Sequence, residues 1–255
     1  MEAGAVVRTL CVANQKGGVG KTTTCINLAA GFAKAGYRTL VVDLDPQCNA
    51  TSGMGESPAS DHPFVREGRL PEAIRATRVP GLSLVPGCRE WNAIEMLMRW
   101  SAEDMRVLRR RLEEASSVFD EVLIDCPPSL GGLTRAALSA ADEVLMPIQC
   151  EYFAMEGLTQ MIHVIREVMR VEPGRLEFGG ILMTMYDERL ELTREVEREV
   201  REFFGEIAFE TVVPRDVAVA EAPSHGMSVL DYGPRTRGAR AYVELCMEVL
   251  NRDEG

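Results

Sequence analysis

The stretch NQKGGVGKTTT, from Asn14 to Thr24, decides how this chain folds. It follows an apolar run and precedes a segment with helical periodicity, which is the context of a loop that binds phosphate groups. Such loops usually read GxxxxGK[ST], but here Gln15 stands where the pattern has its first glycine. A second lysine, Lys16, stands at the entrance of the loop. The stretch therefore predicts a phosphate site with an additional cation.

Glycines and two polar side chains define the expected chemistry of this loop. Its glycines let the backbone approach phosphate oxygens and direct N–H groups at them, and the following helix adds a favourable dipole. Lys21 is expected to neutralise the β and γ phosphates, and Thr22 to place its hydroxyl on Mg²⁺. The nucleotide-binding residues expected in the loop are Lys16, Gly17, Gly18, Val19, Gly20, Lys21, Thr22 and Thr23.

Outward from the loop, apolar runs alternate with helical segments. The expected strands are 9–13, 39–44, 82–85, 121–124, 143–147, 178–183 and 211–213. The expected helices are 23–35, 102–116, 133–140, 154–169, 190–204 and 237–250, with a helical turn near 217–220. Strands that are apolar on both faces predict one doubly wound, mostly parallel α/β sheet with helices on both faces. We expect a single domain over residues 1–255, with a mobile surface loop at 55–68.

Composition narrows the classes of function. The net charge of −11 argues against a surface coated with positive charge, so any DNA contact must come from a local patch. No apolar stretch approaches the ~20 residues of a membrane span, and none resembles a signal sequence, which predicts a cytoplasmic protein. The seven cysteines lack metal-binding spacing and are expected to be reduced structural thiols. Of 28 basic residues only Lys16, Lys21 and Lys34 are lysines, so two of the three lie in the loop.

Two later strands end in carboxylates. Asp43 and Asp45 follow the second strand on one face, and Asp125 ends the strand in EVLIDCPPS, the arrangement of a Walker B carboxylate that holds Mg²⁺ through water. The carboxyl ends of parallel strands form the crevice where α/β sheets bind ligands. The stretch 126–134 has two prolines and then two glycines, which predicts a switch that senses the γ-phosphate. Together these elements predict hydrolysis of a nucleoside triphosphate.

Five segments of the chain closely resemble the ParA-type partition ATPases, also called the Soj group, within the larger family that includes MinD. They are KGGVGKTT, VVDLDPQCNATSG, DCPPSLG, CEYFAMEGL and VPRDVAVAEAPSHG, and the resemblance covers about Val7 to Val249. It implies an Mg²⁺-dependent ATPase that forms a homodimer around two ATP molecules. Lys16 would then reach the phosphates bound by the other subunit, where a cation supplied in trans stabilises the transferring phosphoryl group.

The same resemblance implies further residue roles. Asp45 would position the attacking water, Asp43 would lie near the metal and Asp125 would be the Walker B carboxylate. Gly17 would pack against the partner subunit's nucleotide, so that a bulky side chain there blocks closure of the dimer. The contacts to adenine would come from Pro214 and Asp216.

The resemblance also implies partners. The ATP dimer would bind DNA non-specifically and associate with the nucleoid. A ParB-type activating protein would stimulate hydrolysis, and the cycle would partition a chromosome or plasmid. Where that family often reads PRNVRLSEAPSHG, this chain reads PRDVAVAEAPSHG, so Ala218 replaces a basic residue and one expected phosphate contact is absent. The candidate DNA-binding residues are Arg215, Arg235, Arg237 and Arg240. The arginines at 194, 198 and 201 alternate with glutamates and equally fit a self-paired, solvated helix.

Four alternatives stay open. A ParA-like ATPase could position a protein cargo instead of DNA. A MinD-like membrane ATPase is disfavoured because the acidic C-terminal end would repel anionic lipid. An iron–sulfur reductase needs cysteines at a dimer axis, for which Cys126 and Cys150 are the candidates. A metabolic kinase or synthetase would transfer phosphate to a small molecule, and Lys16 and the partition-type segments disfavour this alternative.

Overall fold

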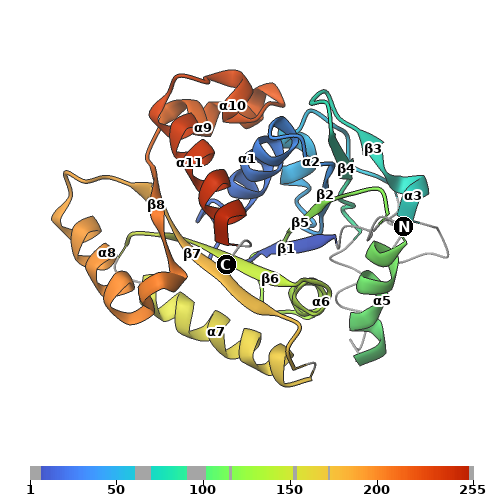
Figure 1. Ribbon diagram of the computed structural model, residues 1–255, viewed down its shortest axis with the longest axis horizontal. Helices are drawn as coiled ribbons and strands as arrows, with labels where there is room; N and C mark the ends of the chain where they lie inside the picture. The colour runs from blue at the N-terminus through green and yellow to red at the C-terminus, as the bar shows by residue number, and fades with distance from the viewer. Residues whose placement is uncertain are drawn as a thin grey trace.

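The computed structural model describes residues 7–60, 70–90, 102–114, 117–151, 154–171 and 173–252. One eight-stranded sheet runs through them in the order β3-β4-β2-β5-β1-β6-β7-β8 (Figure 1). Its strands are β1 (Arg8–Val12), β2 (Thr39–Asp43), β3 (Arg75–Ala76), β4 (Leu82–Val85), β5 (Glu121–Asp125), β6 (Glu143–Gln149), β7 (Glu177–Tyr186) and β8 (Ala208–Pro214). Only the short β3 pairs antiparallel within this described sheet. The predicted doubly wound, mostly parallel sheet is confirmed.

Helices cover both faces of the sheet. They are α1 (Lys21–Lys34), α2 (Asn49–Gly53), α3 (Leu70–Ala73), α5 (Ala102–Glu113), α6 (Gly132–Ala140), α7 (Ala154–Val171), α8 (Glu191–Phe204), α9 (Val217–Glu221), α10 (Val229–Tyr232) and α11 (Arg237–Arg252), with short 3-10 turns η1 (Gly205–Ile207) and η2 (Ala222–His225). Figure 1 shows α7 and α8 below the sheet and α1, α9, α10 and α11 above it. Each face has its own apolar cluster. Because both faces are covered, β2 and β5 are buried along their whole length.

The strand register places the candidate site. β1 lies between β5 and β6, and Val12 at its end is the register partner of Asp125. In the neighbouring pair, Asp43 of β2 is the register partner of Asp125 as well. The loop after β1 and the two carboxylates therefore meet at one edge of the sheet.

Several small elements were not predicted. The five-residue α2 is rich in residues with low helix propensity, and its periodicity is too short to read. The strands β7 and β8 extend beyond the predicted 178–183 and 211–213. Much of the expected loop at 55–68 lies outside the described residues. The described part of this loop is held by a hydrogen bond, which Ala59 N–H donates to Gly87 O at 2.9 Å.

Packing against α11 fixes the position of α1, the helix that follows the loop. The hydroxyl groups of Thr24 in α1 and Tyr242 in α11 are 3.3 Å apart. Lower on α1, a Cβ atom added to Gly31 would lie 2.1 Å from Cys246 Sγ. The two helices are therefore packed too closely at this point for any side chain on Gly31.

Gly31→Ala is expected to destabilise the protein by about 1–3 kcal/mol because the new methyl group overlaps Cys246 Sγ. In a helix without this contact, the same change stabilises by up to about 1 kcal/mol. Urea unfolding would measure the free energy. In a Cys246→Ala background the penalty should shrink, because the nearest remaining atom, Cys246 Cβ, is 3.4 Å away. Equal penalties in the two backgrounds would contradict this account of the packing.

Candidate active site

The loop between β1 and α1 depends on two glycines for its backbone path. Gly18 has φ of 74° and Gly20, which caps α1, has φ of 91°. Side chains rarely adopt these left-handed values, so both positions favour glycine. Gly17 differs, because its φ is not positive and a Cβ there would contact only Pro128 Cβ, at 3.9 Å. Within this subunit the backbone does not require glycine at position 17.

The two lysines of the loop lie in different surroundings. Lys21 is buried and its Nζ donates to the backbone oxygen of Lys16 at 2.9 Å. Burial lowers the pKa of Lys21, and the nearby carboxylate of Asp125 opposes this effect. Lys16 is more exposed, and its Nζ lies 2.9 Å from Glu151 Oε2. The loop therefore presents one sheltered ammonium group and one at its rim.

Thr22 and Asp125 form the part of the site that suits a metal ion. The hydroxyl of Thr22 donates to Asp125 Oδ2 at 2.8 Å. Asp125 is fully buried, and its Oδ1 has no hydrogen-bond partner among the described residues. Burial raises the pKa of this carboxyl well above its usual value, and the charge of Asp43 adds to the effect. A buried, unpartnered carboxylate oxygen beside a hydroxyl fits Mg²⁺, which prefers oxygen ligands and keeps several waters.

Both carboxylate oxygens of Asp43, unlike those of Asp125, accept hydrogen bonds from the protein. Its Oδ2 accepts hydrogen bonds from the N–H and the hydroxyl of Thr51, at 2.8 and 2.6 Å, and its Oδ1 accepts one from Asp45 N–H at 3.1 Å. Burial raises its pKa to about 6. The hydroxyl of Thr51 also accepts from Gly87 N–H at 2.8 Å. Asp43 thus ties β2 to α2, and its expected place near the metal stays a prediction.

Asp45 lies at the wall of a cleft of about 520 Å³ above the loop. Its Oδ1 accepts a hydrogen bond from Gln47 N–H at 2.9 Å, and burial raises its pKa. Most of the predicted nucleotide residues line this cleft: Gly17, Gly18, Gly20, Lys21, Thr22 and Thr23. Val19 is buried, and its carbonyl accepts from the hydroxyl of Thr184 at 2.8 Å. Lys16 is not among the lining residues.

The two expected adenine residues lie elsewhere. Neither Pro214 nor Asp216 lines the cleft. Asp216 caps α9, because its Oδ1 accepts from Ala218 N–H and its Oδ2 from Gly238 N–H, both at 2.9 Å. The geometry gives Asp216 a structural role, and its contact with adenine stays a prediction without support here.

The lining residues that were not predicted include Met185, Pro223 and Ser224. Pro223 and Ser224 belong to the segment EAPSHG, which the sequence marked without assigning it a role. Met185, at the end of β7, has φ of 50°, which no sequence signal indicates.

A second cleft, of about 490 Å³, gathers arginines. Arg215, Arg237 and Arg240 line it together with Arg189, which was not predicted, whereas Arg235 does not. Arg189 is paired with Asp187 at 2.7 Å. The ion pairs found among the described residues include none with the three predicted arginines. This cleft also carries the acids Glu188 and Glu244.

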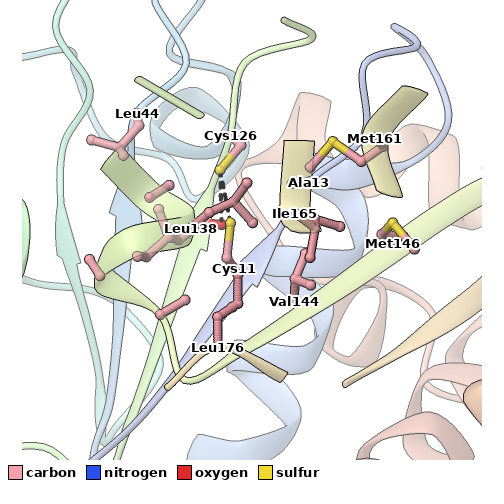
Figure 2. Close-up of a cluster of buried hydrophobic side chains, with 14 of the residues drawn as sticks. Cys11, Ala13, Leu44, Cys126, Leu138, Val144, Met146, Met161, Ile165 and Leu176 are labelled. Atoms are coloured by element: carbon pink, nitrogen blue, oxygen red, sulfur yellow. Dashed lines mark hydrogen bonds between the residues drawn. The ribbon is translucent and has the colours of Figure 1, made fainter. Parts of the chain in front are cut away.

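All seven cysteines are buried and none is in a disulfide. Cys11 and Cys126 point toward each other inside an apolar cluster, with their sulfur atoms 3.3 Å apart (Figure 2). Cys126 and Cys150 both lie in this apolar cluster of their own subunit. Cysteines that bind an iron–sulfur cluster at a dimer axis would instead face the partner subunit. Within the described ranges, every helix is too short or too polar to cross a membrane.

Comparison with known proteins shows which proteins this chain resembles. The chain matches the AAA domain family over residues 7–178. It is 43% identical over 248 residues to the sporulation initiation inhibitor protein Soj of Bacillus subtilis, covering 95% of this chain and 98% of that protein. It is 44% identical to the chromosome-partitioning ATPase Soj of Thermus thermophilus, with 97% of each chain covered. Its structure is similar to that of cobyrinic acid a,c-diamide synthase from Mycobacterium smegmatis with bound ATP analogue and magnesium, with a TM-score of 0.84, 32% identity, and 98% and 97% of the chains covered.

Asp125→Asn is expected to raise the melting temperature of the nucleotide-free protein by about 2–4 °C, the shift that accompanies 1 kcal/mol in a chain of this size. The change removes a buried charge whose Oδ1 has no partner. Because the folded-state pKa of Asp125 lies above its unfolded value, this group destabilises the protein increasingly as the pH rises past the ordinary aspartate range of about 3.9. The difference in melting temperature should therefore be larger near pH ~8 than near pH ~5.

The neighbouring carboxylate supplies the contrast for this experiment. Asp43→Asn should lower the melting temperature, because an amide nitrogen cannot accept the hydrogen bonds that Asp43 receives from Thr51 and Asp45. Added Mg²⁺ and ATP should stabilise the Asp125→Asn variant less than the wild type. Equal melting temperatures for Asp125→Asn and wild type at both pH values would show that the buried charge is compensated.

Proposed function

The chain belongs to the Soj and ParA family of partition ATPases, and from this premise we propose that it is an ATP-driven positioning switch. In this proposal the subunit binds Mg²⁺ and ATP and dimerises, the dimer binds DNA non-specifically, and a ParB-type partner stimulates hydrolysis. The ADP form then separates and leaves the DNA. The protein would act in the cytoplasm on the nucleoid and partition a chromosome or plasmid.

The observation that carries the proposal is the separation of the two lysines. Lys21 lines the cleft, whereas Lys16 is not among the lining residues and its ammonium group pairs with Glu151 at the rim. A cation in that position can serve a nucleotide held by a second subunit. Gly17 supports the same conclusion, because its own subunit leaves room for a side chain there. Glycine at this position suits a surface that another molecule closely covers.

Each residue of the site would have a separate role in hydrolysis. The loop N–H groups and Lys21 would hold the phosphates, and Thr22 and Asp125 would hold Mg²⁺, which supplies charge neutralisation when bound. Asp45, at the cleft wall, would position the attacking water. Lys16 from the partner subunit would stabilise the charge that develops in the transition state, so that hydrolysis depends on pairing of the subunits. The ATP analogue and magnesium bound by the similar synthase agree with this choice of ligands.

The arginine cleft is the best candidate for the DNA surface. Arg215, Arg237 and Arg240 are exposed and form none of the ion pairs found among the described residues, although the charge of Arg215 acts on Asp187. They can therefore contact phosphates. Two consecutive residues of β7 connect the clefts, because Met185 lines the nucleotide cleft and Tyr186 lines the arginine cleft. A movement of this strand end on nucleotide binding would reach both surfaces.

A synthetase is the second candidate function, because the chain shares 32% identity with a diamide synthase over 98% of its length. The identity of 42–44% with the partition ATPases favours the first. ATP hydrolysis that proceeds without any small-molecule acceptor, and that rises with DNA, would support the partition function over synthesis.

Lys16→Ala is expected to lower the ATPase rate by at least about 100-fold, because it removes a preorganised donor to the transition state. ATP binding by the monomer should survive. In the wild type, the rate per subunit at saturating Mg²⁺ and ATP should rise with protein concentration. Lys34→Ala is the matched control, because Lys34 lies on the outer side of α1, where it pairs with Asp231. A wild-type rate that is independent of concentration would count against the trans role.

The triple change of Arg215, Arg237 and Arg240 to Ala is expected to weaken non-specific duplex binding in the ATP state. The slope of log affinity against log salt should fall by about 3, since each lost phosphate contact removes about 0.9. Fluorescence anisotropy across a salt series measures both quantities. Arg170→Ala, on the exposed side of α7, is the control, and Arg235→Ala tests whether the surface extends beyond the cleft. An unchanged slope would remove these arginines from the interface.

A further inference from the structure

The rim lysine has a fixed partner in its own subunit. Lys16 Nζ donates to Glu151 Oε2 at 2.9 Å. The other carboxylate oxygen of Glu151 accepts from Gln149 Nε2 at 2.5 Å, and Glu151 N–H donates to Gln149 O at 2.8 Å. The carboxylate that holds Lys16 is therefore itself held by the turn that ends β6.

The backbone of Lys16 is tied to the same strand. Its N–H donates to Asn14 Oδ1 at 3.0 Å, and Asn14 Nδ2 donates to Pro147 O in β6 at 2.8 Å. The carbonyl of Lys16 accepts from Lys21, as described above. Both ends of the Lys16–Glu151 pair thus rest on β6, so its geometry does not depend on a mobile support.

The pair is strong enough to place Lys16 and weak enough to exchange. The side chains of Lys16 and Glu151 are 37% and 50% exposed, so water screens the attraction. Exposed pairs of this kind change an equilibrium constant by about 1.5- to 5-fold. A triphosphate carries several negative charges and would compete successfully for the same ammonium group.

We propose that Glu151 is a positioning residue that retains Lys16 in its own subunit until the partner's nucleotide takes it over. This inference rests on the proposed trans role of Lys16. Dimerisation then includes an exchange, in which Lys16 leaves Glu151 and reaches the phosphates of the second subunit. Glu151 consequently raises the protein concentration at which the ATP dimer forms.

The first test examines the pair directly, without nucleotide. The chain has only three lysines, so acylation of each amine can be followed separately by mass spectrometry. In Glu151→Gln, the labelling rate of Lys16 relative to Lys34 should rise by about 1.5- to 5-fold, because the amine must leave the carboxylate to react. Labelling of Lys21 serves as a check that the loop is intact. An unchanged ratio would overturn the proposal.

The second test examines the exchange during dimerisation. At saturating Mg²⁺ and ATP, Glu151→Gln should lower the protein concentration that gives the half-maximal rate by about 1.5- to 5-fold. The shift should shrink near 1 M salt, where the Debye length falls to about 3 Å and the attraction between the two side chains weakens. Glu114→Gln removes an exposed pair with Arg111 on α5 and should cause no shift. A higher half-maximal concentration in Glu151→Gln would also overturn the proposal.

The two ideas can fail separately. If Lys16→Ala keeps the wild-type dependence of rate on concentration, the trans role itself is wrong. If Lys16→Ala abolishes activity while Glu151→Gln changes neither labelling nor the half-maximal concentration, only the positioning role of Glu151 is wrong. In a Lys16→Ala background, Glu151→Gln should have no further effect on ATP binding, whereas a general structural role would still produce one.

Discussion

The parallel pairing of β5 with both β1 and β2 is the constraint on which the nucleotide cleft depends. It makes Asp125 the register partner of Val12 on one side and of Asp43 on the other. A slip of one residue would turn each of these side chains to the opposite face of the sheet. The loop after β1, the hydroxyl of Thr22 and the two buried carboxylates therefore keep their relative positions only while this register holds.

This register also concentrates negative charge in a buried place. Asp43 and Asp125 are completely buried, and Asp45 is nearly so. Hydrogen bonds from Thr51 and Asp45 satisfy Asp43, while Asp125 receives one from Thr22 and keeps an unpartnered oxygen. The positive charge of Lys21 partly compensates that of Asp125. An uncompensated buried charge is costly, so the site is arranged to gain stability when a cation and a nucleotide arrive.

The sequence predicted the sheet, the large helices and the phosphate loop, because apolar strands and long periodic segments give strong local signals. It missed short elements such as α2, whose conformation depends on the tertiary hydrogen bonds of Thr51. The family resemblance implied a contact of Asp216 with adenine, which stays a prediction; in the structure that carboxylate accepts hydrogen bonds at two helix starts. Arg189, Met185 and the Lys16–Glu151 pair were not predicted. Each is defined by segments distant in the chain, which periodicity and motifs do not relate.

The free space around Gly17 has a consequence for mixed populations of subunits. A chain with alanine at this position would fold like the normal chain, since the added Cβ atom would meet only Pro128 Cβ, at 3.9 Å. The defect would appear only at the shared surface. Under the proposed pairing, subunits made from one altered gene copy would therefore remain monomeric. They would lower the number of active dimers without inactivating the dimers formed by subunits from the intact copy.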